Sequence, residues 1–284
     1  MQHSLVKLSP GFGIEVRGVN FRQLSAHKAD LFRALFAEHH LVLVRDAGLS
    51  EDEGVALTET IGPVAIGSHE FTSAAARAAG APEVNVRKFS FVGNQHPDAN
   101  LRDGELLFHS DHTFFKRPLK AISLYSLAAV ARGGETMFVD VGEAYRRLPE
   151  PVKARIANLH ARHMVSYTAF SGKERPRYRP GDNCAVATHP LVLAHPESGE
   201  MLLFASRLLT ESIIGLDYDE GESLLQTLFG YIEDEAHRYV HKWEVGDFLV
   251  WDNRQLQHAR RDFNSEEKRA LRRVPIDDLM PTSV

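Results

Sequence analysis

The stretch GDFLVWDNRQLQH, residues 246–258, begins as a strongly apolar strand and ends in a polar turn. Short strands are predicted throughout the second half of the chain, at residues 186–193, 200–205, 238–243 and 247–251. Many short strands separated by turns are typical of two-layered β-proteins. We therefore expect a β-sandwich or barrel core.

Helices are predicted to flank this core. Ser25 is placed to cap a helix over residues 25–40, and Ser50 with Glu53 has capping-box spacing for a helix over 50–61. The other predicted elements are helices over 143–159 and 219–235, a helix or loop over 72–81, strands over 12–20 and 41–45, and a strand followed by a loop over 83–105. The predicted fold class is mainly β with flanking helices, and residues 1–284 are assigned to one domain.

The amino-acid composition limits which partners and which metal ligands the protein can have. Lys plus Arg number 33 and Asp plus Glu 38, so the net charge of −5 disfavours nucleic acid as a partner. The single cysteine, Cys184, excludes an internal disulfide and a cysteine-based metal site, whereas 15 histidines leave imidazole and carboxylate as metal ligands. There is no signal-peptide pattern, and no apolar run approaches the roughly 20 residues of a membrane span. We therefore expect a cytoplasmic protein without a membrane partner.

A metal site is predicted from His109 and Asp111 in the stretch LLFHSDHTFF, residues 106–115. Side chains alternate along a strand, so these two would face one side and His112 the other, and His258 is the best third ligand. Two imidazoles and one carboxylate are the ligands of non-heme Fe(II) oxygenases, which keep positions open for a cosubstrate and dioxygen. The competing interpretation of His-x-Asp is a structural hydrogen-bonding pair.

A basic segment follows His258, with six Lys or Arg residues between 260 and 273. If the part from Lys268 is a strand, Arg269 and Arg273 share a face. Carboxylates of bound small molecules are natural partners for two such guanidinium groups. The remaining basic residues are expected on a solvated surface: Arg260, Arg261, Lys268 and Arg272.

Four stretches together closely resemble the TauD/TfdA family of Fe(II)- and 2-oxoglutarate-dependent dioxygenases. They are FHSDHTFFKRP (108–118), ARGGETMFVDVGEAYRRLP (131–149), THPLVLAHPESGEMLLF (188–204), and GDFLVWDNRQLQHARRDF with KRALRR (246–273). The resemblance spans most of the chain and implies that the core is a double-stranded β-helix, or jelly roll, with extra helices.

The resemblance also implies a role for each matching residue. The three predicted metal ligands match the iron ligands, and Thr136 and Arg269 match residues that bind the cosubstrate 2-oxoglutarate. Arg273 matches an arginine near the anionic group of the prime substrate, although it could instead help to bind 2-oxoglutarate. Without the resemblance, Thr136 is an ordinary strand threonine.

The chain departs from the family where the prime substrate would bind. Phe108 stands where many members have tryptophan, and Glu105 stands where taurine-specific members have asparagine. His69 lies in the region where those members place a histidine, so Phe108 and His69 join Arg273 as candidate substrate residues. Residues 165–185, rich in arginine and proline, are predicted to form a mobile loop or lid.

The predicted function is an Fe(II)- and 2-oxoglutarate-dependent dioxygenase. It would use O2 to hydroxylate a small anionic carboxylate or sulfonate, and it would release succinate and CO2. The product can fragment if the oxidised carbon bears an ether oxygen, an amine or a sulfonate. Two alternatives stay open at this point: a zinc-dependent hydrolase and a non-catalytic ligand-binding jelly roll, each using the same His/Asp/His site. By resemblance we expect a homo-oligomer, either a dimer or a tetramer.

Overall fold

The computed structural model describes residues 3–65, 88–95, 104–166, 172–175, 177–178 and 183–278. The predicted element over 72–81 and the candidate substrate residue His69 lie outside the described residues. Nearly half of the candidate lid over 165–185 lies outside them as well, so the lid remains a prediction.

The largest sheet has seven strands, and the apolar stretch predicted at 247–251 is its central strand. Neighbouring strands run antiparallel except for the parallel second and third strands. The third and fourth strands are buried along their whole length, which explains why each has a continuous apolar run instead of an alternating one. In order across the sheet they are β1 (Ser4–Lys7), β2 (Ile14–Arg17), β3 (Leu41–Val44), β14 (Phe248–Asp252), β6 (Ala121–Ala128), β16 (Ala270–Ile276) and β4 (Ser90–Gly93).

A four-stranded sheet faces the large one. Its order is β13 (Tyr239–His241), β7 (Thr136–Asp140), β15 (Leu256–Arg260) and β5 (Leu106–His109). The core between the sheets contains Leu249 and Trp251 from β14 and Phe138 and Leu256 from the small sheet, all buried. Two antiparallel sheets packed in this way form the predicted jelly roll.

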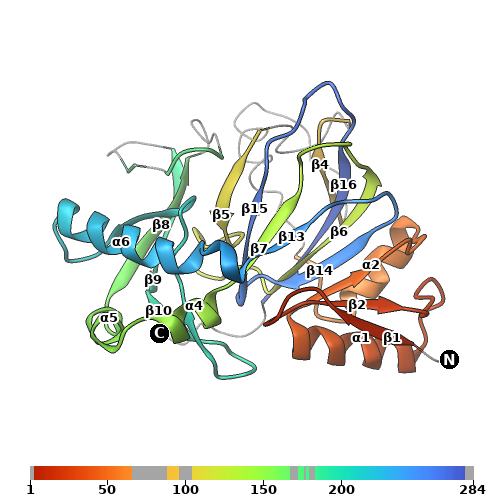
Figure 1. Cartoon of the computed structure of the whole chain (residues 1–284), viewed down its shortest axis with the longest axis horizontal. Coiled ribbons are helices and arrows are strands. Elements are labelled where there is room, and N and C mark those ends of the chain that lie inside the picture. Colours follow the sequence, from red (N-terminus) through yellow and green to blue (C-terminus); the bar gives the residue numbers. More distant parts are fainter. Residues whose placement is uncertain are drawn as a thin grey trace.

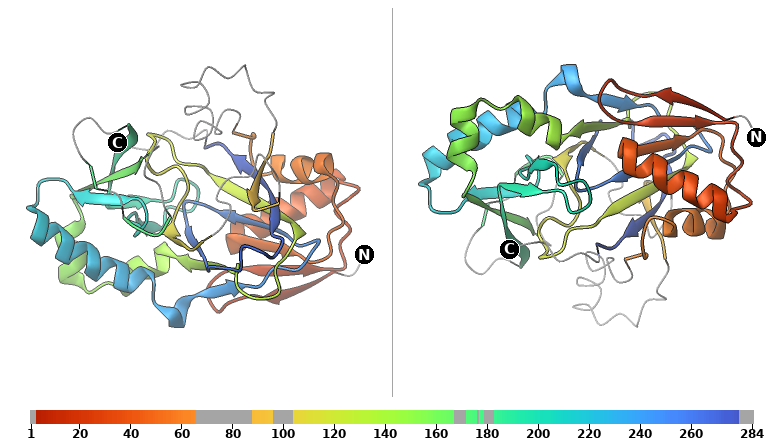
Figure 2. Two further views of the ribbon diagram at one scale, coloured as in Figure 1. Left: turned by 90° about the horizontal axis from the view of Figure 1, so that it is seen from above. Right: turned by 90° about the horizontal axis from the view of Figure 1, so that it is seen from below.

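Helices cover the outer face of each sheet (Figures 1 and 2). On the large sheet, α1 (Ala26–His39) and α2 (Glu51–Glu59) pack in one apolar cluster with β3 and β14. On the small sheet, α4 (Val141–Arg147), α5 (Glu150–Ile156) and α6 (Tyr218–Ile232) pack against the outward residues Met137, Val139 and Ala259. The core between the two sheets is therefore covered by helices on both sides.

The predicted caps of the first two helices are confirmed. The Ser25 side chain accepts a hydrogen bond from the Lys28 backbone N–H, and Ser50 and Glu53 form the complete capping box. The single helix predicted over 143–159 is wrong, because the chain forms two helices there. Leu148 is extended at ψ 139° before Pro149, as the steric demand of proline requires.

The remaining strands form two small sheets beside the jelly roll. One contains β12 (Thr210–Ile213), β8 (His160–Ser166) and β9 (Cys184–Pro190), and the other contains β10 (Val192–Ala194) and β11 (Met201–Leu203). The strand predicted over 186–193 is therefore two strands separated at Leu191. A short 3-10 helix (Glu235–His237) precedes β13. Within the described ranges, no helix is long and apolar enough to cross a membrane.

Candidate metal centre and anion site

The two histidines of the predicted site lie on adjacent strands of the small sheet. His109 ends β5 and His258 is in the middle of β15, and the antiparallel register places them directly opposite each other. Their ring centroids are 4.3 Å apart. His258 occupies the same face of β15 as the core residue Leu256, so both imidazoles face the interior between the two sheets.

Asp111 reaches the histidines from a turn. The prediction from side-chain alternation, in which His109 and Asp111 share one strand, is wrong in this respect. Strand β5 ends at His109, and His112 has a left-handed backbone conformation with φ 64°. The side chain of Asn253 holds this turn in place. Its Oδ1 accepts a hydrogen bond from the Asp111 backbone N–H at 2.8 Å, and its Nδ2 donates to the backbone oxygens of Asp111 and Leu119, both at 3.0 Å.

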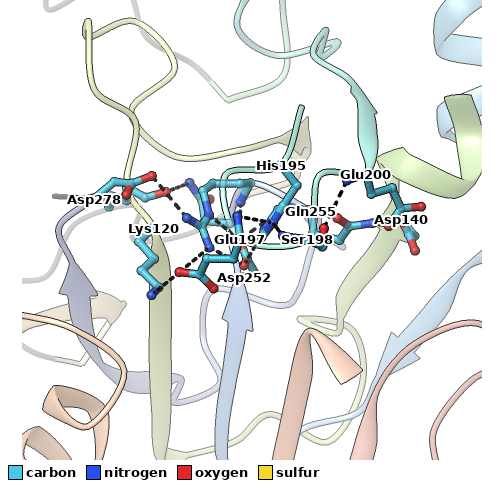
Figure 3. A network of polar contacts seen from close by, with 12 residues as sticks. Lys120, Asp140, His195, Glu197, Ser198, Glu200, Asp252, Gln255 and Asp278 are labelled. Carbon is cyan, nitrogen blue, oxygen red and sulfur yellow. Dashed lines mark hydrogen bonds and ion pairs between the residues drawn. The ribbon is translucent and has the colours of Figure 1, made fainter. Parts of the chain in front are cut away.

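A buried charge network fixes the turn that carries Asn253 (Figure 3). The Asp252 carboxylate accepts hydrogen bonds from Arg254 Nη2 at 2.8 Å and from His195 Nε2 at 3.0 Å. Nδ1 of His195 accepts from the backbone N–H groups of Glu197 and Ser198, which leaves its hydrogen on Nε2. Burial opposes ionisation of Asp252, but these two partners hold its pKa below the ordinary value.

The donor atoms of the three residues converge on one point. His109 Nε2 lies 3.2 Å from Asp111 Oδ1, and His258 Nε2 lies 3.9 Å from the same oxygen. Metal–ligand bonds of about 2.0–2.2 Å place neighbouring donor atoms about 3 to 3.5 Å apart, so the spacing is close to that of a metal centre. Within the described part of the chain, this is the only group of three or more potential metal ligands, with all donor atoms within 4.8 Å of one another.

The protonation states also suit a metal. His109 Nδ1 lies 2.7 Å from the Leu107 backbone oxygen and donates to it, which leaves the lone pair on Nε2. Burial, with repulsion from His109, lowers the pKa of His258 to about 3. Burial would raise the pKa of Asp111, but Arg273 and the two histidines hold it well below its usual range. At neutral pH the cluster therefore presents neutral His258 and an ionised carboxylate, the forms that bind metals.

Of the two predicted anion-binding arginines, Arg273 contacts this cluster directly. Arg273 of β16 donates from Nη2 to Asp111 Oδ2 at 2.6 Å, while the other oxygen of Asp111 faces the histidines. Arg269 precedes β16 and is buried, and its Nη2 makes a long hydrogen bond of 3.3 Å to the Gly134 backbone oxygen. Its Nη1 has no hydrogen-bond partner among the described residues.

Burial, with repulsion from Arg260, lowers the pKa of the Arg269 guanidinium to about 9. Thr136, the other residue matched to 2-oxoglutarate, is buried at the start of β7, two residues after Gly134. A buried cation with a spare N–H fits a carboxylate, because the carboxylate supplies both the missing charge and the missing acceptor.

The structure does not bring Phe108 into the site. Its side chain is buried on the opposite face of β5 from His109, in one apolar cluster with Met137 and Ala259, and the Arg238 guanidinium lies 5.2 Å from its ring. Strand alternation explains this, since a residue next to an inward-facing histidine faces outward.

The expectation of a solvated surface is wrong for two of the other basic residues. Arg272 is buried under α2, where its Nη2 donates to the Ser50 backbone oxygen and its guanidinium lies 4.8 Å from the Tyr125 ring. Arg260 is buried and donates twice to the Gly104 backbone oxygen. A helix or loop covers each position, which the basic pattern did not reveal. Arg261 and Lys268 are exposed, as predicted.

Two residues near the site carried no role in the sequence analysis. Asn253 belongs to the quoted Trp-Asp-Asn-Arg stretch, and its place in a turn directly before β15 was the available signal. Trp243 is one of only two tryptophans, and its indole Nε1 donates to Thr136 Oγ1 at 2.9 Å. No local pattern in the sequence indicated that contact.

Comparison with known proteins gives a family-level match. The family model described as "Taurine catabolism dioxygenase TauD, TfdA family" matches residues 4–274, nearly the whole chain. This match confirms the resemblance inferred from the four sequence stretches.

Individual relatives agree with the family match. The (S)-phenoxypropionate/alpha-ketoglutarate-dioxygenase of Sphingobium herbicidovorans is 29% identical over 287 residues, which cover 94% of this chain and 92% of that protein. An alpha-ketoglutarate-dependent sulfate ester dioxygenase from Pseudomonas putida is 32% identical over 62% of this chain and 61% of its own length. The crystal structure of a taurine dioxygenase from Burkholderia xenovorans matches with a TM-score of 0.77 and 25% identity, over 99% of this chain and 93% of that one.

Proposed function

The chain belongs to the taurine catabolism dioxygenase TauD, TfdA family, and from this membership we propose that it oxidises a small organic anion at His109, Asp111 and His258. It is a dioxygenase that depends on Fe(II), 2-oxoglutarate and O2. The observation that carries the assignment to these residues is the convergence of three metal-donor atoms, and the buried Arg269 guanidinium with its unused N–H supports it.

In this proposal His109, Asp111 and His258 hold the iron through Nε2, Oδ1 and Nε2. Three protein ligands leave positions open for the cosubstrate and dioxygen. Bound iron with 2-oxoglutarate and O2 supplies the oxidant for a substrate C–H bond, with release of succinate and CO2. The protein contributes position: Arg269 and Thr136 bind the distal carboxylate of 2-oxoglutarate and so fix its orientation.

The proposed substrate class is a small carboxylate, sulfonate or sulfate ester. Arg273 is half-buried next to the cluster, and its guanidinium already pairs with one carboxylate oxygen of Asp111. An anionic substrate group would find in Arg273 a charged donor next to the oxidising centre. The names of the relatives include a phenoxypropionate and a sulfate ester, and both of those compounds are small organic anions.

The first test is joint binding of Fe(II) and 2-oxoglutarate under argon, read as their weak visible charge-transfer band. We expect the band in the wild-type protein and in Asp219→Ala, which changes an exposed aspartate on α6. Asp111→Ala should abolish it, because the carboxylate ligand is lost. A wild-type protein without the band would contradict the proposed site. Substrate turnover under argon without 2-oxoglutarate would favour the hydrolase alternative.

The second test assigns Arg273. Succinate release is measured under air with Fe(II) and ascorbate against a panel of carboxylates, sulfonates and sulfate esters. With a stimulating substrate, Arg273→Gln should raise the substrate KM about tenfold or more, because a charged hydrogen bond is lost. Arg261→Gln changes an exposed arginine of the same segment and should leave that KM unchanged. A rise in the dissociation constant of 2-oxoglutarate, with the substrate KM unchanged, would move Arg273 to cosubstrate binding.

The proposed oligomeric state is a homodimer or homotetramer, by membership of the family alone. Size-exclusion chromatography with light scattering measures it directly against the monomer mass of 31.8 kDa.

A further inference from the structure

The hydroxyl of Thr136 is held by an indole that the proposed function does not use. Thr136 Oγ1 lies 2.9 Å from Nε1 of Trp243. The two residues are 3% and 6% exposed. Both polar groups are therefore shielded from water, and each needs a partner within the fold or in a bound molecule.

The chemistry of the two groups fixes the direction of their hydrogen bond. An indole N–H can only donate, whereas a hydroxyl donates one hydrogen and accepts at its lone pairs. Thr136 Oγ1 is therefore the acceptor from Trp243. Among the described residues, the Thr136 hydroxyl hydrogen has no acceptor of its own, so it remains available to a bound group.

A second unused donor lies close by. The Arg269 guanidinium packs over Gly134, two residues before Thr136: a Cβ on this glycine would lie 3.2 Å from Arg269 Nε. Nη2 of the guanidinium donates to the Gly134 oxygen, while Nη1 has no hydrogen-bond partner among the described residues. A buried hydroxyl and a buried guanidinium N–H are together suited to the two oxygens of a carboxylate.

We propose that Trp243 is a positioning residue for the distal carboxylate of 2-oxoglutarate. Its N–H occupies a lone pair of Thr136 Oγ1, so the hydroxyl hydrogen is directed to the carboxylate that Arg269 also binds. The inference rests on the proposed function, in which Thr136 and Arg269 bind this carboxylate, and it adds a residue that contacts the cosubstrate only through Thr136.

The indole itself is held firmly. His241, directly opposite Thr136 in the β13–β7 register, packs edge-to-face against the Trp243 ring at 4.5 Å and 89°. Nε2 of His241 lies 3.2 Å from Asp247 Oδ2, and its Nδ1 lies 3.0 Å from the Tyr239 hydroxyl. A hydroxyl oriented before the ligand arrives loses less freedom on binding, so this packing favours affinity for the cosubstrate.

A double-mutant cycle on 2-oxoglutarate affinity tests the inference. The dissociation constant is measured under argon with Fe(II)-loaded protein, by the visible band and by calorimetry. Trp243→Phe keeps a ring but removes the N–H and should weaken binding about fivefold, the equivalent of one ordinary hydrogen bond. Thr136→Val should weaken it about tenfold or more. In the Thr136→Val background, Trp243→Phe should add no more than about twofold, because the hydroxyl that it orients is gone.

The same loss from Trp243→Phe in both backgrounds would overturn the inference, since a purely structural role persists without the hydroxyl. Tyr218→Phe is the control. It removes one hydroxyl from an exposed ring at the start of α6 and should leave the dissociation constant within about twofold. Wild-type protein that does not bind 2-oxoglutarate would contradict the proposed function, whereas binding with an additive cycle would contradict only the role of Trp243.

A second comparison applies if Trp243→Phe does not fold. Thr136→Ser keeps the hydroxyl and should bind 2-oxoglutarate within about twofold of the wild-type protein. A loss as large as that of Thr136→Val would show that the hydroxyl is not the group that matters, and it would overturn the inference.

Discussion

Arg269 is a charged residue that the fold buries without a counterion among the described residues. A lowered pKa of a basic group means that folding disfavours its charged form, and the pKa of Arg269 falls to about 9 through burial and repulsion from Arg260. Arg269 therefore destabilises the free protein at neutral pH, and an anion that pairs with it relieves this effect. If Arg269 binds 2-oxoglutarate as proposed, the free protein loses stability and the complex gains affinity.

Arg269→Met should separate these two effects. Methionine has a similar shape and no charge, so the melting temperature of the free protein should stay the same or rise. The dissociation constant of 2-oxoglutarate should rise about a hundredfold, because a buried charged hydrogen bond is lost. Differential scanning fluorimetry with and without Mn(II) and 2-oxoglutarate measures both. A clearly lower melting temperature of the free variant, compared with the exposed control Arg261→Met, would contradict the account.

His163 of β8 is a second buried titratable residue, and it lies outside the proposed chemistry. Burial, with repulsion from His189, lowers its pKa from 6.5 to about 3. Between these values the unfolded chain binds the proton more readily than the folded one, so the free energy of unfolding decreases as the pH falls through this window. Above it, His163 contributes no pH dependence.

His163→Gln should reduce this acid sensitivity. Between pH 7.5 and pH 5, the free energy of unfolding should fall by about 2 kcal/mol more in the wild-type protein than in the variant. This value follows from the linkage relation for such a pKa difference. Urea unfolding at the two pH values measures the difference. Equal losses in the two proteins would mean that His163 is protonated in the folded state at pH 5.

At the level of elements, the turn between β14 and β15 links the strand of His258 to the turn of Asp111. It leads into the strand that carries His258, and its Arg254 binds Asp252 at the end of β14. Its Asn253 forms two hydrogen bonds with the backbone of Asp111 and one with the backbone oxygen of Leu119. The turn residues thus set the position of a proposed metal ligand that is 142 residues away in the sequence.

Asn253→Ala should weaken both stability and metal binding. The variant leaves the N–H and C=O of Asp111 and the C=O of Leu119 without this partner, which should cost about 2–3 kcal/mol of unfolding free energy. Because Asp111 is no longer held, Mn(II) affinity measured by calorimetry should fall as well. Asn264→Ala removes one exposed contact and is the control. Unchanged Mn(II) affinity in Asn253→Ala would show that Asp111 is positioned by other contacts.

At the scale of the molecule, the N-terminal layer is packed onto the sheet that supports the site. Phe32 of α1 is fully buried, with its ring 5.5 Å from Phe21 and 6.1 Å from Phe248 of β14. Both tryptophans lie in the core between the sheets, on the other side of β14 from this contact. Tryptophan fluorescence therefore reports on the jelly roll, while Phe32 belongs to the helical layer.

Phe32→Ala tests whether the chain is one domain, as the sequence analysis predicts. The cavity left by the ring should lower the free energy of unfolding by about 3–5 kcal/mol. If helix and jelly roll unfold together, the urea midpoints by tryptophan fluorescence and by far-UV circular dichroism should shift by the same amount. A fluorescence midpoint that does not move would indicate two independent units. Leu24→Ala, at a 36% exposed position, should shift neither midpoint measurably.

Structural features that depend on residues close together in the sequence could be predicted well. The caps at Ser25 and Ser50 depend on side chains within three residues of the backbone groups that they bind, and the buried strand at 247–251 shows as an uninterrupted apolar run. The predicted exposure of a side chain was wrong where residues distant in the sequence pack against it. Arg260 and Arg272 have the sequence pattern of surface residues, but Gly104 and α2 cover them.

The sequence by itself determined the family, the order of the main elements and the residue types of the proposed site, because these are carried by local patterns and by the motif stretches. Only the tertiary structure decided how the site is assembled. It placed Asp111 in a turn held by Asn253, turned Phe108 away from the site, and brought Trp243 to Thr136 across 107 residues. Such contacts depend on which strands pair and in which register, and a change of one residue in register would turn every side chain to the opposite face.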